Sequence, residues 1–227
     1  MKYVILDFGG VLVYPPTGSW TITPKFLELI DKNKLDNEKA MFNAKKNSSL
    51  TDCARPLKTL EEEYEAMVSF YDLVLSNSYE GYEKRLSEEI AKDRVYQFEK
   101  YKLYDGVIEE LERLSREYSL ILLSDNWPSC LKYMKHYGID KYFTRIYISS
   151  FYGTKKEEGT FFDILLKDVN IKPENAVFID DHSKNLDIAK TKGIQGILMD
   201  RENKQTNSNY YVIHSLKELG EKIERTI

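Results

Sequence analysis

The sequence predicts an α/β protein, a Rossmann-like doubly wound parallel sheet with a helical domain inserted after its first strand. Two patterns predict this class. From residue 107 to residue 223, continuous apolar strands alternate with amphipathic helices, as in a parallel sheet covered on both faces. Between the first strand and this alternation, residues 15–95 show helical periodicity and no strand-like runs.

The first strand is the most informative segment. An apolar run from Tyr3 to Leu6 ends at Asp7, and a glycine pair, Gly9 and Gly10, follows closely. Burying an unpaired carboxylate is costly, so a buried strand that ends in aspartate indicates a functional role for that residue. In open α/β sheets, ligands bind at the carboxyl ends of the strands, which is where Asp7 is expected.

The inserted segment is predicted to be a small helical domain. Pro24 suits the first turn of a helix. Apolar residues then recur at spacings of three and four in two further stretches, around 60–71 and 82–98. The predicted boundaries place residues 15–95 in the inserted domain and residues 1–14 and 96–227 in the core.

The rest of the chain supplies the other elements of the sheet and its covering helices. Strands are expected at 120–124, 145–149, 177–180 and 196–199, with helices near 107–114, 130–137, 161–165, 183–189 and 216–223. Ser183 is a good helix cap, and Gly193 is expected to end the helix that Ser183 begins.

Composition excludes several classes of protein. The 227 residues are 42% hydrophobic and 31% charged, with a net charge of −4, so no basic surface predicts a nucleic-acid partner. No apolar run approaches the ~20 residues of a membrane span. The two cysteines, Cys53 and Cys130, show no metal-ligand spacing and no disulfide framework. A cytoplasmic protein, monomeric or homodimeric, is the expectation.

The candidate chemistry lies after four strands. The first ends at Asp7, the second at Ser124 with Asp125 and Asn126, the third is followed by a loop with Lys155 and Lys156, and the fourth ends at Asp180 and Asp181. Taken in order, these segments resemble the four sequence motifs of the haloacid dehalogenase superfamily. The resemblance spans nearly the whole chain, and the inserted segment is similar to the helical cap domain of one branch of that superfamily.

The resemblance implies a magnesium-dependent phosphatase that acts on a small phosphomonoester. Asp7 would be the nucleophile and form an aspartyl-phosphate, and Lys156 would neutralise the charge of the phosphate and of Asp7. The phosphate would contact Gly9, Gly10, Ser124, Asp125 and Lys156. Mg2+ would be held by Asp7, the main-chain carbonyl of Gly9 and Asp180, with Asp181 direct or through water. Lys155 is the adjacent alternative to Lys156.

Two residues depart from the pattern of these phosphatases. The position two residues after the nucleophile usually carries a second aspartate that acts as general acid and base, and here it is Gly9. General acid–base catalysis is worth ~10²–10⁴-fold in rate, so a weak phosphatase is expected unless water, His182 or a cap residue substitutes. Asp125 stands where many relatives have asparagine, and its charge would repel a phosphate unless it points away or pairs with a lysine.

Gly9 leaves two other functions open. Dehalogenases of this superfamily also lack the second aspartate, but they need no metal, which would leave Asp180 and Asp181 without a purpose. A degenerate member that binds a phosphorylated ligand or a protein partner without catalysis is the other alternative. The dependence of turnover on Mg2+, and its loss on replacing Asp7, separate these readings.

Overall fold

The fold is described from a computed structural model, which defines residues 2–204 and 208–226. Its main sheet has six strands in the order β5-β4-β1-β6-β7-β8, and every neighbouring pair is parallel. The strands are β1 (Tyr3–Leu6), β4 (Ser119–Ser124), β5 (Phe143–Ile148), β6 (Ala176–Asp180), β7 (Gln195–Met199) and β8 (Tyr211–Ile213). Successive strands run outward on one side of β1 and then on the other, which confirms the doubly wound α/β class.

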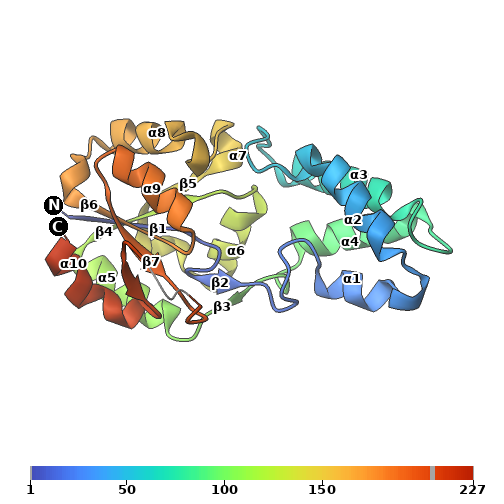
Figure 1. The fold of residues 1–227 in the computed structure, drawn as a ribbon, viewed down its shortest axis with the longest axis horizontal. Helices are drawn as coiled ribbons and strands as arrows, with labels where there is room; N and C mark the ends of the chain where they lie inside the picture. Colours follow the sequence, from blue (N-terminus) through green and yellow to red (C-terminus); the bar gives the residue numbers. More distant parts are fainter. Residues whose placement is uncertain (1, 205–207, 227) are drawn as a thin grey trace.

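Helices cover both faces of this sheet, as Figure 1 shows. Alternate residues of the central strands face opposite sides: Val4 and Leu6 belong to one hydrophobic cluster, and Ile5 belongs to the other. The helices of the core are α5 (Val107–Glu117), α6 (Ser129–Tyr137), α7 (Ser149–Tyr152), α8 (Thr160–Val169), α9 (Ser183–Thr191) and α10 (Leu219–Thr226). Because the central strands are apolar on both faces, burial in the middle layer is the arrangement that removes them from water.

A second, helical body lies beside the sheet (Figure 1). It contains α1 (Pro24–Leu29), α2 (Asn37–Lys46), α3 (Leu60–Leu75) and α4 (Lys84–Tyr96), which share a hydrophobic cluster of their own. Helix α3 begins with a capping box, in which Thr59 and Glu62 satisfy each other's backbone N–H groups. We propose that residues 15–95 form a cap domain, with its apolar centre around Met67 and Ile90.

Two short strands connect this helical body to the sheet. Strand β2 (Val13–Tyr14) pairs antiparallel with β3 (Lys102–Leu103), so the chain leaves and re-enters the core side by side. Neither of these short strands was predicted from the sequence. Within residues 2–204 and 208–226, no helix has the length and apolar character needed to cross a membrane.

Candidate active site

The predicted site residues gather around a cavity of about 300 Å³ at the carboxyl ends of β1, β4 and β6. The cavity lies at the point where the strand order reverses about β1, which is where open α/β sheets bind ligands. Its lining comprises Asp7, Gly9, Trp20, Tyr101, Ser124, Asp125, Asn126, Trp127, Lys156, Asp181, His182 and Asn185.

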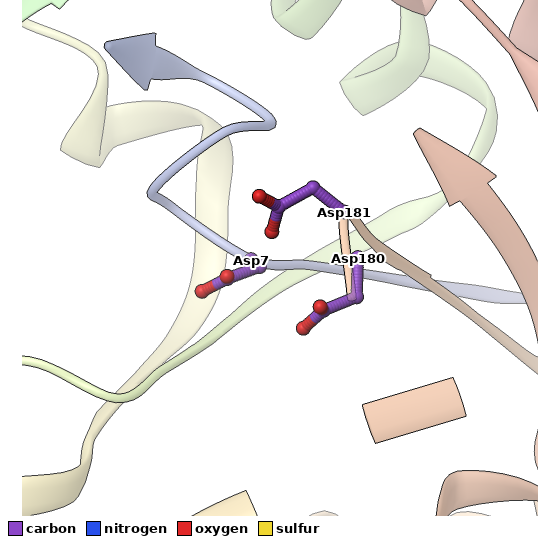
Figure 2. A group of neighbouring side chains, drawn as sticks. All are labelled: Asp7, Asp180 and Asp181. Atoms are coloured by element: carbon purple, nitrogen blue, oxygen red, sulfur yellow. The ribbon is translucent and has the colours of Figure 1, made fainter. Parts of the chain in front are cut away.

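Three carboxylates meet at this edge of the sheet (Figure 2). Asp7 follows β1, Asp180 is the last residue of β6, and Asp181 is the next residue along the chain. One oxygen from each carboxylate lies within 4.8 Å of the others. The two strands pair directly, with Leu6 opposite Ile179, so their parallel register brings the acidic ends together.

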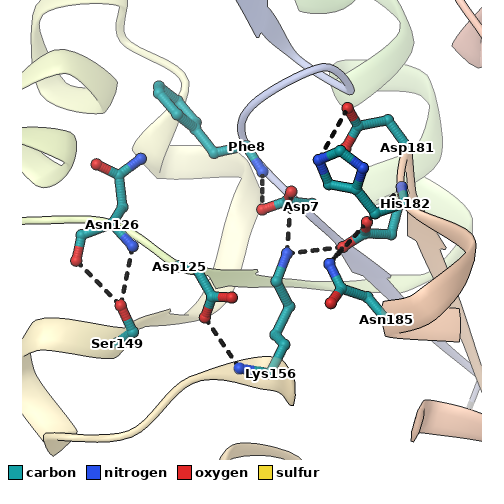
Figure 3. A network of polar contacts seen from close by, with 10 residues as sticks. Asp7, Phe8, Asp125, Asn126, Ser149, Lys156, Asp181, His182 and Asn185 are labelled. Atoms are coloured by element: carbon teal, nitrogen blue, oxygen red, sulfur yellow. Dashed lines mark hydrogen bonds and ion pairs between the residues drawn. The ribbon is translucent and has the colours of Figure 1, made fainter. Parts of the chain in front are cut away.

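Lys156 bridges two of these carboxylates from inside the protein (Figure 3). Its Nζ lies 3.0 Å from Asp7 Oδ2 and 2.6 Å from Asp180 Oδ2, and its side chain is only 2% exposed. Burial alone would lower the pKa of Lys156, but the carboxylates of Asp180 and Asp7 outweigh it and raise that pKa. The ammonium therefore stays charged beside Asp7. Lys155 instead pairs with Asp52 and Glu157 outside the cavity.

Asp180 and Asp181 occupy different environments although they are adjacent. Asp180 is fully buried, and its oxygens accept hydrogen bonds from Lys156 Nζ, from Asn185 Nδ2 at 3.0 Å and from the backbone N–H of His182 at 2.8 Å. Asp181 lines the cavity, and its side chain is 29% exposed. Asp180 is thus engaged in holding Lys156 and α9, whereas Asp7 and Asp181 present oxygens to the cavity.

The charges of this cluster fit a divalent cation. Burial raises the pKa of Asp7 to about 8. The charge of Lys156 opposes this shift, and the carboxylates of Asp180 and Asp181 add to it. Burial also raises the pKa of Asp181, and Asp180 adds to that shift. The single positive charge of Lys156 therefore does not balance the three carboxylates of this cluster. An all-oxygen donor set with few carboxylates, open to a cavity, is the kind of site that Mg2+ prefers.

The glycine pair allows close packing against this cluster. Gly10 has a positive φ of 69°, and a Cβ atom at Gly10 would overlap the carboxylate of Asp181. Gly9 lies under the indole of Trp20, whose Cη2 would be 3.1 Å from a Cβ at Gly9. Glycine at position 10 is therefore required by both the backbone and Asp181, whereas at position 9 it makes room for an aromatic ring.

Ser124 and Asp125 are adjacent in the sequence but make different contacts. Ser124, the last residue of β4, is 1% exposed and lines the cavity, where a phosphoryl contact was expected. Asp125 accepts a hydrogen bond from the backbone N–H of Lys156 at 3.0 Å, so it anchors the loop that carries the lysine. Burial raises the pKa of Asp125, opposed by the charge of Lys156. Asn126, in turn, donates its backbone N–H to Ser149 Oγ at 2.9 Å.

Several residues of the cavity have no role predicted from the sequence. Asn185, in the first turn of α9, holds both oxygens of Asp180, and its proximity in sequence to that aspartate was the available signal. Part of the lining is aromatic, formed by Trp20, Tyr101 and Trp127, with the rings of Trp20 and Tyr101 edge to face at 5.5 Å. Trp20 comes from the inserted segment, where no motif marked it.

The chain is similar in sequence to known hydrolases. Residues 1–191 match the family model of haloacid dehalogenase-like hydrolases. A phosphorylated carbohydrates phosphatase of Thermotoga maritima is 27% identical over 148 residues, which is 64% of this chain and 62% of that protein. The chain thus spans less than two thirds of the length of this curated relative.

Two solved structures share the fold along nearly their whole length. A 2-haloacid dehalogenase from Pseudomonas syringae pv. Tomato superimposes with a TM-score of 0.66 at 17% identity, over 99% of each chain. The HAD-hydrolase YfnB from Bacillus subtilis, solved with bound magnesium, gives a TM-score of 0.67 at 18% identity, over 98% of each chain. With the family model matching most of its length, this chain belongs to the haloacid dehalogenase-like hydrolases.

Proposed function

We propose that this hydrolase is a Mg2+-dependent phosphatase that cleaves a small phosphomonoester through an aspartyl-phosphate on Asp7. The observation that carries the proposal is the placement of Asp7, paired with Lys156 at 3.0 Å, beside a cluster of carboxylates at the base of a cavity. The relative from Thermotoga maritima, a phosphorylated carbohydrates phosphatase, supports a small phosphorylated substrate.

The chain's own groups account for the chemistry. Asp7 attacks phosphorus, the bond from phosphorus to the leaving oxygen breaks, and the leaving oxygen takes the electron pair. Lys156 stabilises the phosphoryl oxygens, and Ser124 donates a hydrogen bond to one of them. Water then attacks the phosphorus of the aspartyl-phosphate, the bond from phosphorus to the Asp7 oxygen breaks, and inorganic phosphate leaves with the Asp7 carboxylate restored. Mg2+, held by Asp7, Asp180 and the carbonyl of Gly9, with Asp181 direct or through water, would neutralise charge on the nucleophile and the phosphate.

The absence of a general acid at position 9 determines which esters are expected to react fastest. Gly9 supplies no proton to the leaving oxygen, so the proton must come from water or from a group such as His182 that lines the cavity. The side chain of His182 is 73% exposed and lies 3.8 Å from Asp181. We expect esters with good leaving groups, which need little protonation, to be hydrolysed fastest.

Hydrolysis of p-nitrophenyl phosphate and a panel of sugar phosphates, with and without Mg2+, tests the proposal. We expect turnover that needs Mg2+ and falls by at least ~10³-fold in Asp7→Asn, because the nucleophile is removed. Asp163→Asn is the matched control, since that exposed carboxylate pairs with Lys192 on the surface. Turnover that survives Asp7→Asn, or that ignores Mg2+, contradicts the proposal.

Dehalogenation is the second candidate, and the indole of Trp20 over Gly9 favours it, because that ring fills the space where a phosphatase keeps its acid. Chloride release from L-2-chloropropionate without Mg2+ would establish it. If neither phosphate esters nor haloacids react while phosphate still binds, the chain is a binding protein that has lost catalysis.

A further inference from the structure

Arg94 is a buried cation whose hydrogen-bonding capacity is largely unused. It lies on α4, is 1% exposed, and donates from Nη1 to the carbonyl oxygen of Trp20 at 2.7 Å. Its Nε and Nη2 are buried and meet no hydrogen-bond acceptor among residues 2–204 and 208–226. A guanidinium is always charged, and removing its donors from water without acceptors costs free energy. Such an arrangement is expected where a ligand completes the site.

The carboxylate whose charge acts on Arg94 already has other hydrogen-bond partners. Glu63, on α3, is fully buried and accepts hydrogen bonds from the backbone N–H and the Oγ of Ser129, both at 2.7 Å. It also lies 4.0 Å from the ammonium of Lys100. In the part of the chain that the structure describes, no carboxylate comes within 4.0 Å of Arg94. Arg94 thus has no ion-pair partner in direct contact; burial alone would lower its pKa, and Tyr71, Tyr101 and Glu63 nearby outweigh burial and raise it.

Arg94 contacts the aromatic wall of the catalytic cavity. Its guanidinium carbon lies 4.9 Å from the ring centroid of Trp127, and its one hydrogen bond goes to Trp20. Both tryptophans line the cavity. The indole Nε1 of Trp127 is also buried without an acceptor among the described residues. Arg94 itself does not line the cavity but lies behind these two tryptophans, so three buried donor atoms without acceptors stand next to the aromatic wall.

We propose that Arg94, with Trp127 Nε1, binds a second anionic oxygen group on the substrate, a carboxylate or a further phosphate carried by the leaving group. The forked donors of a guanidinium match the paired oxygens of either anion. The proposal rests on the proposed phosphatase function for the other end of the substrate. Because Arg94 does not line the cavity, the proposal requires Trp20, which is 42% exposed, to move aside when the group binds.

Tryptophan fluorescence can report this binding directly, because the chain's two tryptophans are the two that line the cavity. The Asp7→Asn variant with Mg2+ is titrated with two pairs of probes, so that no turnover occurs. 3-Phosphoglycerate and glycerol 3-phosphate differ by a carboxylate, and fructose 1,6-bisphosphate and fructose 6-phosphate differ by a phosphate. We expect at least one doubly anionic probe to bind about tenfold tighter than its partner, as a charged hydrogen bond provides.

Substitution of Arg94 in the same background identifies the group responsible. Arg94→Gln is expected to remove the difference within the favoured pair and leave the singly anionic probe unaffected, and Arg94→Lys to restore part of it. Arg85→Gln is the matched control, because Arg85 lies on the same helix with its side chain 74% exposed beside Glu89. Circular dichroism verifies folding, and if Arg94→Gln does not fold, the Arg94→Lys titration decides.

The outcomes separate this proposal from the proposed function. Equal binding of both members of each pair overturns it, and so does an Arg94→Gln variant, folded, that weakens both members alike. Discrimination by Arg94 without hydrolysis of any ester in the wild-type protein leaves the anion site standing and removes the phosphatase. Hydrolysis of esters by a protein that binds both members of each pair equally leaves the phosphatase standing and removes the anion site.

Discussion

Trp20 and Gly9 together explain the departure from the phosphatase pattern at the level of single residues. The indole fills the space in front of Gly9, with Cη2 3.1 Å from where a Cβ would stand. A side chain at position 9 therefore needs that ring to move. The glycine and the tryptophan form one feature, and the sequence revealed only the glycine.

Restoring the missing acid should require both residues to change. Gly9→Asp alone is expected to gain little p-nitrophenyl phosphate hydrolysis, because the new carboxylate competes with Trp20 for space. Gly9→Asp with Trp20→Ala is expected to gain about 10²-fold in kcat over Trp20→Ala alone, the lower range of general acid–base catalysis. Equal rates for Gly9→Asp and for Gly9→Asp with Trp20→Ala would show that Trp20 does not restrict position 9.

Gly10 offers a test of the carboxylate cluster that replaces none of its side chains. Gly10→Ala introduces a Cβ that overlaps Asp181, so we expect that carboxylate to be displaced and the Mg2+ concentration for half-maximal activity to rise by about tenfold or more. Gly18→Ala is the control, because Gly18 also has a positive φ but nothing lies within 4 Å of its Cβ position. Both variants carry the backbone strain of ~1–2 kcal/mol, and only Gly10→Ala should alter the response to Mg2+.

Among the elements, long periodic segments were predictable and short ones were not. A continuous apolar run predicts strand β4, and apolar residues at spacings of three and four predict helix α3. Strand β8 has three residues, Tyr211–Ile213, and β2 and β3 have two each, too few for a period to show. These short strands form because a neighbouring strand offers free hydrogen-bonding groups, which is tertiary information absent from the local sequence.

A buried polar contact joins the helical body to the core, where Glu63 on α3 accepts hydrogen bonds from Ser129 on α6. Glu63→Gln removes the charge that faces Lys100 and one of the two acceptors used by Ser129. We expect the free energy of unfolding to fall by about 1–3 kcal/mol, because a buried donor of Ser129 then loses its charged acceptor. Denaturant titration measures this, with Glu65→Gln, an exposed residue on the same helix, as control. A loss no larger than that of the control would show that this link contributes little.

At the scale of the whole molecule, the acidic edge of the site followed from sequence, whereas its aromatic and basic wall did not. Asp7 and Asp180 end strands of one parallel sheet, so topology alone brings them to one edge. Trp20 and Arg94 lie in the helical segment, and their positions depend on how that segment packs against the core. Periodicity places such residues on a helix or loop but cannot say which surface of another body they meet.

Lys100 links the two bodies and should make the stability of the whole protein depend on pH. It is 4% exposed, donates to Ser129 Oγ at 2.9 Å, and burial lowers its pKa to about 7, partly offset by Glu63. The unfolded chain keeps the ordinary pKa of 10.5, so between pH 7 and pH 10.5 it binds more protons than the folded protein. Stability therefore rises with pH across that window.

The comparison with Lys100→Met isolates this effect, since methionine has a similar length and no charge. From pH 6 to pH 9, the free energy of unfolding of the wild type should rise by about 2–3 kcal/mol relative to the variant, the amount that a folded pKa near 7 gives by linkage. Parallel denaturant titrations at the two pH values measure the difference. Curves for the two proteins that stay parallel would mean that Lys100 keeps its proton, and that the cap and core are joined by a fixed charge pair with Glu63.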